Sequence, residues 1–230
     1  MPRKALRCKA CGERSEDFPT ACQWESNGIF QAVKRFYSLR GERFAPPFVR
    51  RNGMDREKLE ERLRELPIVQ YEFFETRDLT FTQRVREVCR LECPMYGKSW
   101  ACPPAVGTVE ECRERCLEYP QGLLIVTMAE VPDIADLDAT LATRGPHEEV
   151  TRQVHAAMRE QGAEVYVLST EACAICPECA YPGAPCRHPE LMYPCVESHG
   201  ILVTELAEGF GIGFQAGGNI VTWFSLLLYR

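Results

Sequence analysis

The stretch EVYVLSTEACAICPECAYPGAPC, residues 164–186, joins an apolar segment directly to a run of closely spaced cysteines. Its first six residues, 164–169, alternate and are rich in strand-forming side chains, which predicts a β-strand. The cysteines that follow, at spacings of two, two and six residues, are Cys173, Cys176, Cys179 and Cys186. Prolines at 177, 182 and 185 oppose a helix here. We therefore expect a sheet strand that ends in a rigid, cysteine-rich loop.

Short apolar patterns and amphipathic patterns alternate on either side of this stretch. Strands are expected at residues 68–74, 123–128, 164–169, 211–215 and 220–229, the last two as a hairpin around residues 217–219. Helices are expected at residues 55–66, 80–89, 108–119, 145–161, 190–199 and 202–209. This order predicts an α+β fold with one mixed or antiparallel sheet, helices packed on it, and two cysteine-rich metal-binding loops.

Charge divides the 230-residue chain into two parts. Residues 1–53 carry 11 Lys and Arg against 5 Asp and Glu, a balance of +6, whereas residues 54–230 carry 16 against 28, a balance of −12. We expect a basic, poorly ordered N-terminal extension at 1–53 and a cysteine-rich metal-binding domain at 54–230. The net charge of −6 argues against non-specific nucleic-acid binding.

Cysteine is the unusual residue type, with thirteen in the chain. No secretory signal pattern and no apolar run of membrane-spanning length can be read, so we expect a cytoplasmic protein without a membrane partner. Clustered thiols in a reducing compartment more often bind metal or perform redox chemistry than form disulfides. An N-terminal pair, Cys8 and Cys11, has only Cys22 as a nearby third ligand.

The cysteines of residues 173–186 suit an iron–sulfur cluster. Three thiols at two-residue spacing can surround one side of a cluster, as in bacterial ferredoxins, and the fourth arrives from further along. Zinc is the alternative, although two Cys-x2-Cys pairs would serve it better than this spacing. His188 could replace a thiol in either site.

A second set of thiols lies earlier in the chain, at Cys89, Cys93, Cys102, Cys112 and Cys116. Five thiols exceed by one what a single site needs. We expect Cys89, Cys93, Cys102 and Cys116 to be the ligands, with Cys112 in reserve. Cys195 is expected to be a buried core thiol, since free cysteine often packs as a small apolar side chain.

Several of these segments resemble one family. Cys89–Pro104 contains Cys-Pro, Tyr-Gly-Lys and Cys-Pro-Pro elements, residues 173–189 end in Cys-Arg-x-Pro, and Gly-Ile-Leu-Val and Val-Thr-Trp-Phe follow at 200–203 and 221–224. Together they resemble the predicted metal-binding proteins of domain of unknown function 2284, over roughly residues 54–230. The resemblance implies an iron–sulfur protein of anaerobic microbes with no assigned reaction. It implies as ligands Cys89, Cys93, Cys102, Cys173, Cys176, Cys179 and Cys186.

Three functions remain open from the sequence. The first is electron transfer by one or two 4Fe–4S clusters to a redox partner protein. The second is a zinc-stabilised interaction module, and the third is a redox enzyme with a substrate or corrinoid at a cluster, approached past Tyr96, Lys98, Trp100 and Arg187. No dinucleotide or phosphate-binding loop can be read, and no side chain is marked as catalytic. A homodimer could pair through the strand 223–229.

Overall fold

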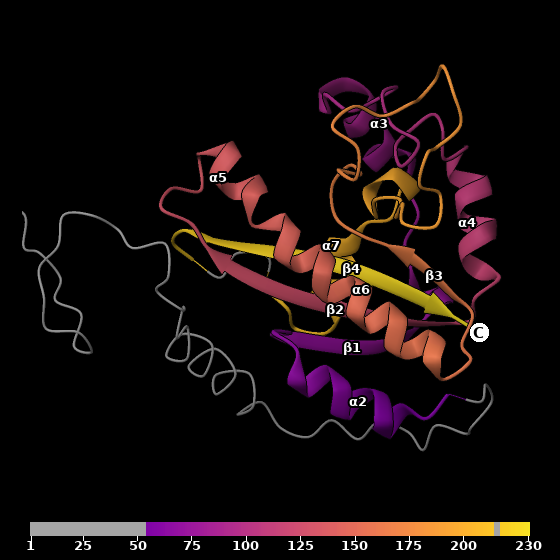
Figure 1. Ribbon diagram of the computed structural model, residues 1–230, viewed down its shortest axis with the longest axis vertical. Helices are drawn as coiled ribbons and strands as arrows, with labels where there is room; N and C mark the ends of the chain where they lie inside the picture. Colours follow the sequence, from indigo (N-terminus) through magenta and orange to yellow (C-terminus); the bar gives the residue numbers. More distant parts are fainter. Residues whose placement is uncertain (1–53, 214–216) are drawn as a thin grey trace, which may run out of the picture. The chain divides into compact units, whose positions relative to one another are not determined.

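A four-stranded antiparallel sheet lies at the centre of the structure (Figure 1). The computed structural model describes residues 54–213 and 217–230. The strands are β1 (Gln70–Glu75), β2 (Gln121–Glu130), β3 (Val165–Leu168) and β4 (Ile220–Tyr229), in the spatial order β1-β2-β4-β3. Each neighbouring pair is antiparallel. The expected α+β fold with one sheet is confirmed.

The central strands are apolar on both faces. In β2, Leu123 and Ile125 belong to one buried cluster, while Leu124 and Val126 belong to the cluster on the opposite face. Successive side chains of a strand point to opposite faces, so this continuous apolar run requires a cover on each side. The sheet is therefore the middle layer of three.

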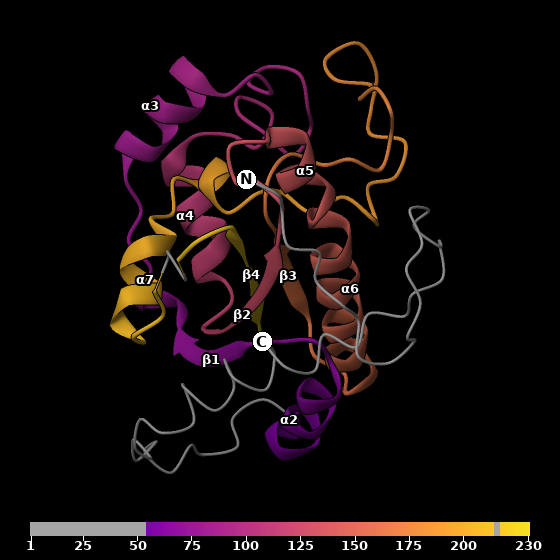
Figure 2. The ribbon, with the colours of Figure 1, turned by 90° about the vertical axis from the view of Figure 1, so that its left-hand side faces the viewer.

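Helices supply both covers (Figure 2). Apolar side chains of α2 and α6 pack on one face, and those of α4 and α7 pack on the other. The helices are α2 (Arg56–Glu65), α3 (Gln83–Glu92), α4 (Val109–Leu117), α5 (Leu137–Ala142), α6 (Arg144–Glu160) and α7 (Val203–Gly209), with short 3-10 turns η1 (Thr76–Asp78) and η2 (Glu197–His199).

Local sequence explains where the helices begin. The Asp55 side chain accepts a hydrogen bond from the Lys58 amide at the start of α2. At α4, Thr108 and Glu111 form a reciprocal capping box, as their spacing predicts. The capping box fixes the point at which the cysteine-containing loop after α3 ends and α4 begins.

Two expected elements are wrong. Residues 190–199 are irregular apart from η2, because Pro194 and Cys195 run alongside the end of β3 instead of entering a helix. Residues 211–213 are not a strand, and β4 pairs with β2 and β3 rather than in the expected hairpin. In the strand expected to pair in a dimer, Leu226–Tyr229 lie between two strands, whereas residues 223–225 pair with β2 alone, so the homodimer stays a prediction.

The expectations for residues 1–53, including Cys8, Cys11 and Cys22, fall outside the described part of the chain. Within the part described, none of the helices combines the length and the apolar character that a membrane span requires.

Candidate metal centre

The first cysteine loop starts at the end of α3. Cys89 is on the last turns of this helix, and Cys93 ends it. Hydrogen bonds within the loop, from the Gly97 amide to the Pro103 carbonyl (2.8 Å) and from the Cys102 amide to the Ser99 carbonyl (3.2 Å), fold the chain back so that Cys102 returns towards Cys93. The loop thus brings together three of the expected ligands.

Cys195 reaches the same place from the other end of the domain. Ser169 follows β3 and pairs with Cys195 in an isolated parallel bridge, and the Cys195 amide donates to the Ala101 carbonyl at 3.4 Å. The residues after it form η2, against which α3 packs. The thiols of Cys89, Cys93, Cys102 and Cys195 therefore form one set, which we call the α3 thiol group.

Electrostatic influence among these thiols shows that they lie close together. Burial, and then the nearby Cys93, raise the pKa of Cys102 to about 12. Burial, and then Glu197 and Cys102, raise the pKa of Cys195 well above its usual value. Burial, followed by Cys93 and Glu197, also raises the pKa of Cys89. At neutral pH these thiols keep their protons, so a metal ion would have to displace them.

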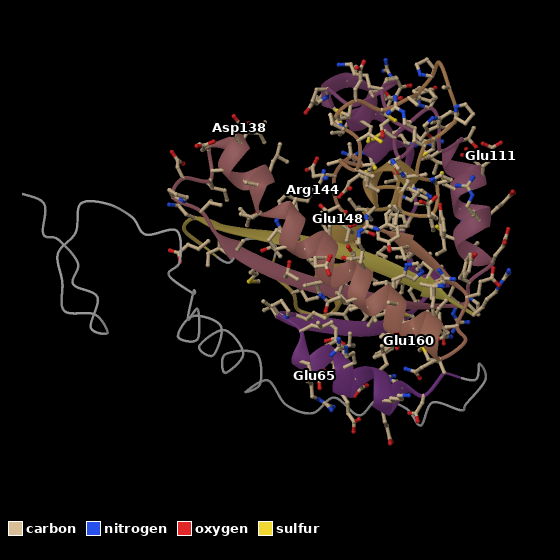
Figure 3. All side chains as sticks on the ribbon, in the orientation of Figure 1. Glu65, Glu111, Asp138, Arg144, Glu148 and Glu160 are labelled. Carbon is tan, nitrogen blue, oxygen red and sulfur yellow. The ribbon has the colours of Figure 1, made fainter. Side chains whose placement is uncertain are left out.

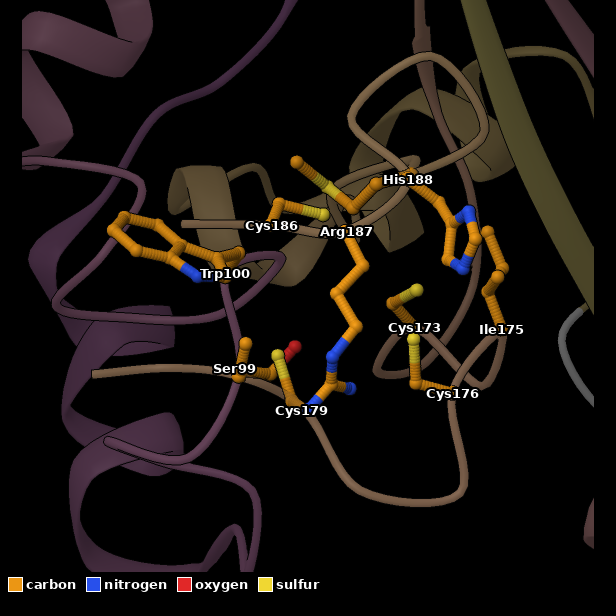
Figure 4. A pocket seen from close by; sticks show the side chains of 11 residues that line it. Ser99, Trp100, Cys173, Ile175, Cys176, Cys179, Cys186, Arg187 and His188 are labelled. Carbon is orange, nitrogen blue, oxygen red and sulfur yellow. The ribbon is translucent and has the colours of Figure 1, made fainter. Parts of the chain in front are cut away.

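The second loop follows β3 and carries the remaining expected ligands. These are Cys173, Cys176, Cys179 and Cys186, which we call the loop thiol group; all four are half-buried. They line one small pocket together with Ser99 and Trp100 of the first loop (Figure 4). The four thiols of this loop, which are expected to bind one metal site, therefore line a single pocket.

Cys179 has an environment unlike that of the other thiols. Its partial burial acts to raise its pKa, but hydrogen bonds from the backbone amides of Tyr181, Trp100 and Ala180 and from the Ser99 side chain outweigh burial. The net effect lowers the pKa of Cys179. Donors that converge on one sulfur stabilise its thiolate, which is the form that binds metal.

The two loops contact each other directly. The Trp100 indole donates to the Ala184 carbonyl at 3.0 Å, and its ring packs edge-on against Tyr181 with the centroids 4.9 Å apart. Ser99 is completely buried and its hydroxyl interacts with both Cys179 and Cys102. Cys102 and Cys173 are also close enough to influence each other. Ser99 and Trp100 therefore form a wall of the loop thiol group, and Ser99 also reaches Cys102 of the α3 thiol group.

The remaining two cysteines occupy a different place. Cys112 and Cys116 lie one turn apart on α4 and are fully buried. Cys116 packs in the apolar core beneath the sheet, and besides burial the groups that shift its pKa are Cys112 and Arg115. The structure thus places Cys116 with Cys112, whereas it places Cys195 with the expected ligands of α3. Sequence reasoning missed the position of Cys195, and no spacing pattern marks it.

The donor chemistry fits a thiophilic metal, although the side chains do not yet enclose one. Among residues 54–213 and 217–230, no three Cys, His, Asp or Glu side chains are already arranged to share an ion. Arg187 extends between the thiols of the loop group and donates to the Glu178 carbonyl at 2.8 Å (Figure 4). This exposed side chain must move before the four sulfurs can converge.

The other side chains considered at the sequence level fall into two places. His188, like Arg187 and Trp100, lines the pocket of the loop thiol group. Lys98 is exposed and Tyr96 is half-buried, and neither lines that pocket.

Comparison with known protein families gives a match. No curated protein and no solved structure is similar to the chain. The family described as "Predicted metal-binding protein (DUF2284)" matches residues 72–229, which include both thiol groups and the sheet that holds them. That range covers well over half of the chain, so the chain belongs to this family of predicted metal-binding proteins.

Proposed function

We propose that this domain is an electron-transfer protein that holds two 4Fe–4S clusters, one at the α3 thiol group and one at the loop thiol group. The observation that carries the proposal is the contact between the two loops through Ser99 and Trp100. It brings the two sets of four thiols together at Ser99, and each set has the number of thiolates that such a cluster takes.

The surroundings of Cys179 favour iron–sulfur over zinc. Hydrogen bonds to the sulfur ligands are a principal means by which proteins tune the potential of an iron–sulfur cluster, which supplies one-electron transfer when bound. Backbone amides near Cys179 lower the pKa of its thiol in this way. A structural zinc ion contributes only folding stability to a domain. This domain has an apolar core on both faces of its sheet and does not need that contribution.

Exposure of the two groups indicates where a redox partner could dock. Three of the four thiols in the α3 group are buried, whereas all four in the loop group are half-buried. A redox partner protein would therefore dock at the loop thiol group, and the Ser99–Trp100 wall would connect it to the interior group.

Metal analysis of anaerobically purified protein tests the proposal. We expect about eight irons and about eight acid-labile sulfides per chain, with a brown absorbance that bleaches on reduction by dithionite. Zinc without sulfide would refute the iron–sulfur assignment and favour a structural module.

The choice of the fourth ligand can be tested with a matched pair of variants. Cys195→Ser is expected to lose about half of the bound iron, because one of two four-thiol sites becomes incomplete. Cys116→Ser changes a thiol that is also buried and is expected to keep its iron. Iron loss in Cys116→Ser, with full iron in Cys195→Ser, would instead favour the ligand set expected from sequence.

A further inference from the structure

A second pocket lies on the other side of Cys173 from the loop thiol group. Its volume is about 260 Å³, and Cys173 and Ile175 line both pockets. The rest of its wall comes from α6 and from the segment at Leu191 and Tyr193. Anything bound there would therefore contact a wall that also carries a proposed metal ligand.

The α6 side of this pocket is positively charged. Arg144, Glu148 and Arg152 lie on successive turns of the helix and face the same space, with Arg144 and Glu148 labelled in Figure 3. Glu148 forms an ion pair with Arg152 at 3.6 Å, so the excess of one positive charge lies at Arg144. This excess occurs in a segment, residues 54–230, whose balance is −12 (16 basic against 28 acidic residues), so general surface composition does not account for it.

Other contacts hold both guanidinium groups in place. Arg152 lies over the Tyr193 ring, 4.6 Å from its centroid, and donates to the Leu191 carbonyl at 3.0 Å. Tyr193 is itself fixed by a 2.8 Å hydrogen bond between its hydroxyl and Nδ1 of His155. Arg144 donates to the Ala172 carbonyl. These bonds use a minority of the N–H groups of each guanidinium, which leaves donors for an anion.

Part of the wall is apolar. Leu191 is 41% exposed at the pocket, and Ala174 and Ile175 line it as well. Inorganic anions gain nothing from such contacts, whereas the hydrocarbon part of an organic acid does. Pockets that bind small molecules combine an apolar wall with a few fixed polar groups in this way.

We propose that this pocket binds a small organic carboxylate, with its carboxylate at Arg144 and Arg152 and its apolar part against Leu191 and Ile175. The bound molecule would lie beside Cys173, and its role as a redox substrate or effector of the adjacent cluster rests on the proposed function. Binding itself depends only on the pocket.

Calorimetric titration of the full-length protein with benzoate tests the pocket. We expect saturable binding, weakened about tenfold or more in Arg144→Gln and in Arg152→Gln, because each loses a charge-assisted hydrogen bond. Arg159→Gln removes the same charge from an exposed position of α6 outside the pocket and is expected to bind like the unmodified protein. Equal affinity in all four proteins, or no saturation, would overturn the proposal.

Glu148→Gln gives a test that loss of folding cannot imitate. Removal of the one carboxylate in the pocket wall is expected to tighten benzoate binding several-fold, since a like charge beside the ligand is lost. Unchanged or weaker binding in this variant would count against the carboxylate orientation. Tighter binding of inorganic phosphate than of benzoate would exclude the role of the apolar wall.

Iron content, measured on the same samples, separates the two proposals. We expect it to be the same in all the arginine and glutamate variants, because none of these side chains is a proposed metal ligand. Benzoate binding without iron would leave the pocket standing and refute the electron-transfer function. Iron without benzoate binding would refute the carboxylate pocket and leave the electron-transfer function standing.

Discussion

His147 makes the stability of the domain sensitive to acid. It is 1% exposed in α6, and its ring joins the two central strands through hydrogen bonds of 2.8 Å between Nδ1 and the Thr127 hydroxyl and 2.7 Å between Nε2 and the Ser225 hydroxyl. Burial lowers the pKa of His147 to about 4 from the usual 6.5. The folded protein therefore holds this imidazole neutral under conditions in which the unfolded chain binds a proton.

The sign and size of the effect follow from proton linkage. Between pH 6.5 and pH 4 the unfolded state binds more protons at this site, so the free energy of unfolding falls as the pH falls. The loss amounts to about 3 kcal/mol below pH 4, of which about 2 kcal/mol has occurred by pH 5. His199, whose pKa burial lowers to about 3, adds a loss of the same sign.

Urea unfolding of the unmodified protein and of His147→Gln, followed by circular dichroism between pH 8 and pH 5, measures this contribution. The unmodified protein should lose about 2 kcal/mol more than the variant over this range, because the variant has no imidazole at that site. Val154→Ala is a suitable control, since it creates a cavity on the same helix and should lower stability equally at every pH. Parallel curves for the unmodified protein and His147→Gln would refute the assignment of a neutral, buried imidazole.

Three further substitutions test the packing around the site. Gly122→Ala should lower the free energy of unfolding by about 1–3 kcal/mol in urea titrations, because a Cβ there would stand 2.2 Å from the Phe74 ring, and unchanged stability would contradict this contact. Thr108→Ala removes half of the capping box with Glu111 and should cost about 1 kcal/mol by the same assay, with Thr108→Ser as the variant that restores it. Ser99→Ala should lower the reduction potential measured by redox titration by on the order of 40 mV, the equivalent of one lost hydrogen bond to sulfur, whereas Ser99→Thr should retain it.

The sheet was largely predictable from local pattern because its strands are short apolar runs flanked by clear breaks. The run at 123–128 in β2 and the alternation before Cys173 each gave a strand at the right place. The prediction of a C-terminal hairpin is wrong for a physical reason. Gly217 and Gly218 do adopt a positive φ, as in turns. However, β4 pairs along its length with the apolar β2 and not with residues 211–213.

The ligand groups were only partly predictable, because spacing reports thiols that are near in sequence. The loop group lies within fourteen residues, and its shared pocket agrees with that spacing. Cys195 is more than ninety positions from Cys102 and joins it through the bridge between Ser169 and the segment after Pro194. Cys116 has the better spacing, but helix α4 turns it into the core. Such long-range placement depends on sheet topology, which no local pattern contains.

The two thiol groups differ in how they can acquire a metal, although they share Ser99. Hydrogen bonds hold the pKa of Cys179 below its usual value, so this thiol of the loop group loses its proton more easily than an ordinary thiol. Burial raises the pKa of Cys102 to about 12 and holds the pKa of Cys195 well above its usual value. Metal binding in the α3 group must therefore release protons that the protein retains strongly. Each proton released makes affinity rise about tenfold per pH unit below the thiol pKa. Loading of the α3 group must therefore require a higher pH, and at falling pH this group should lose its metal first.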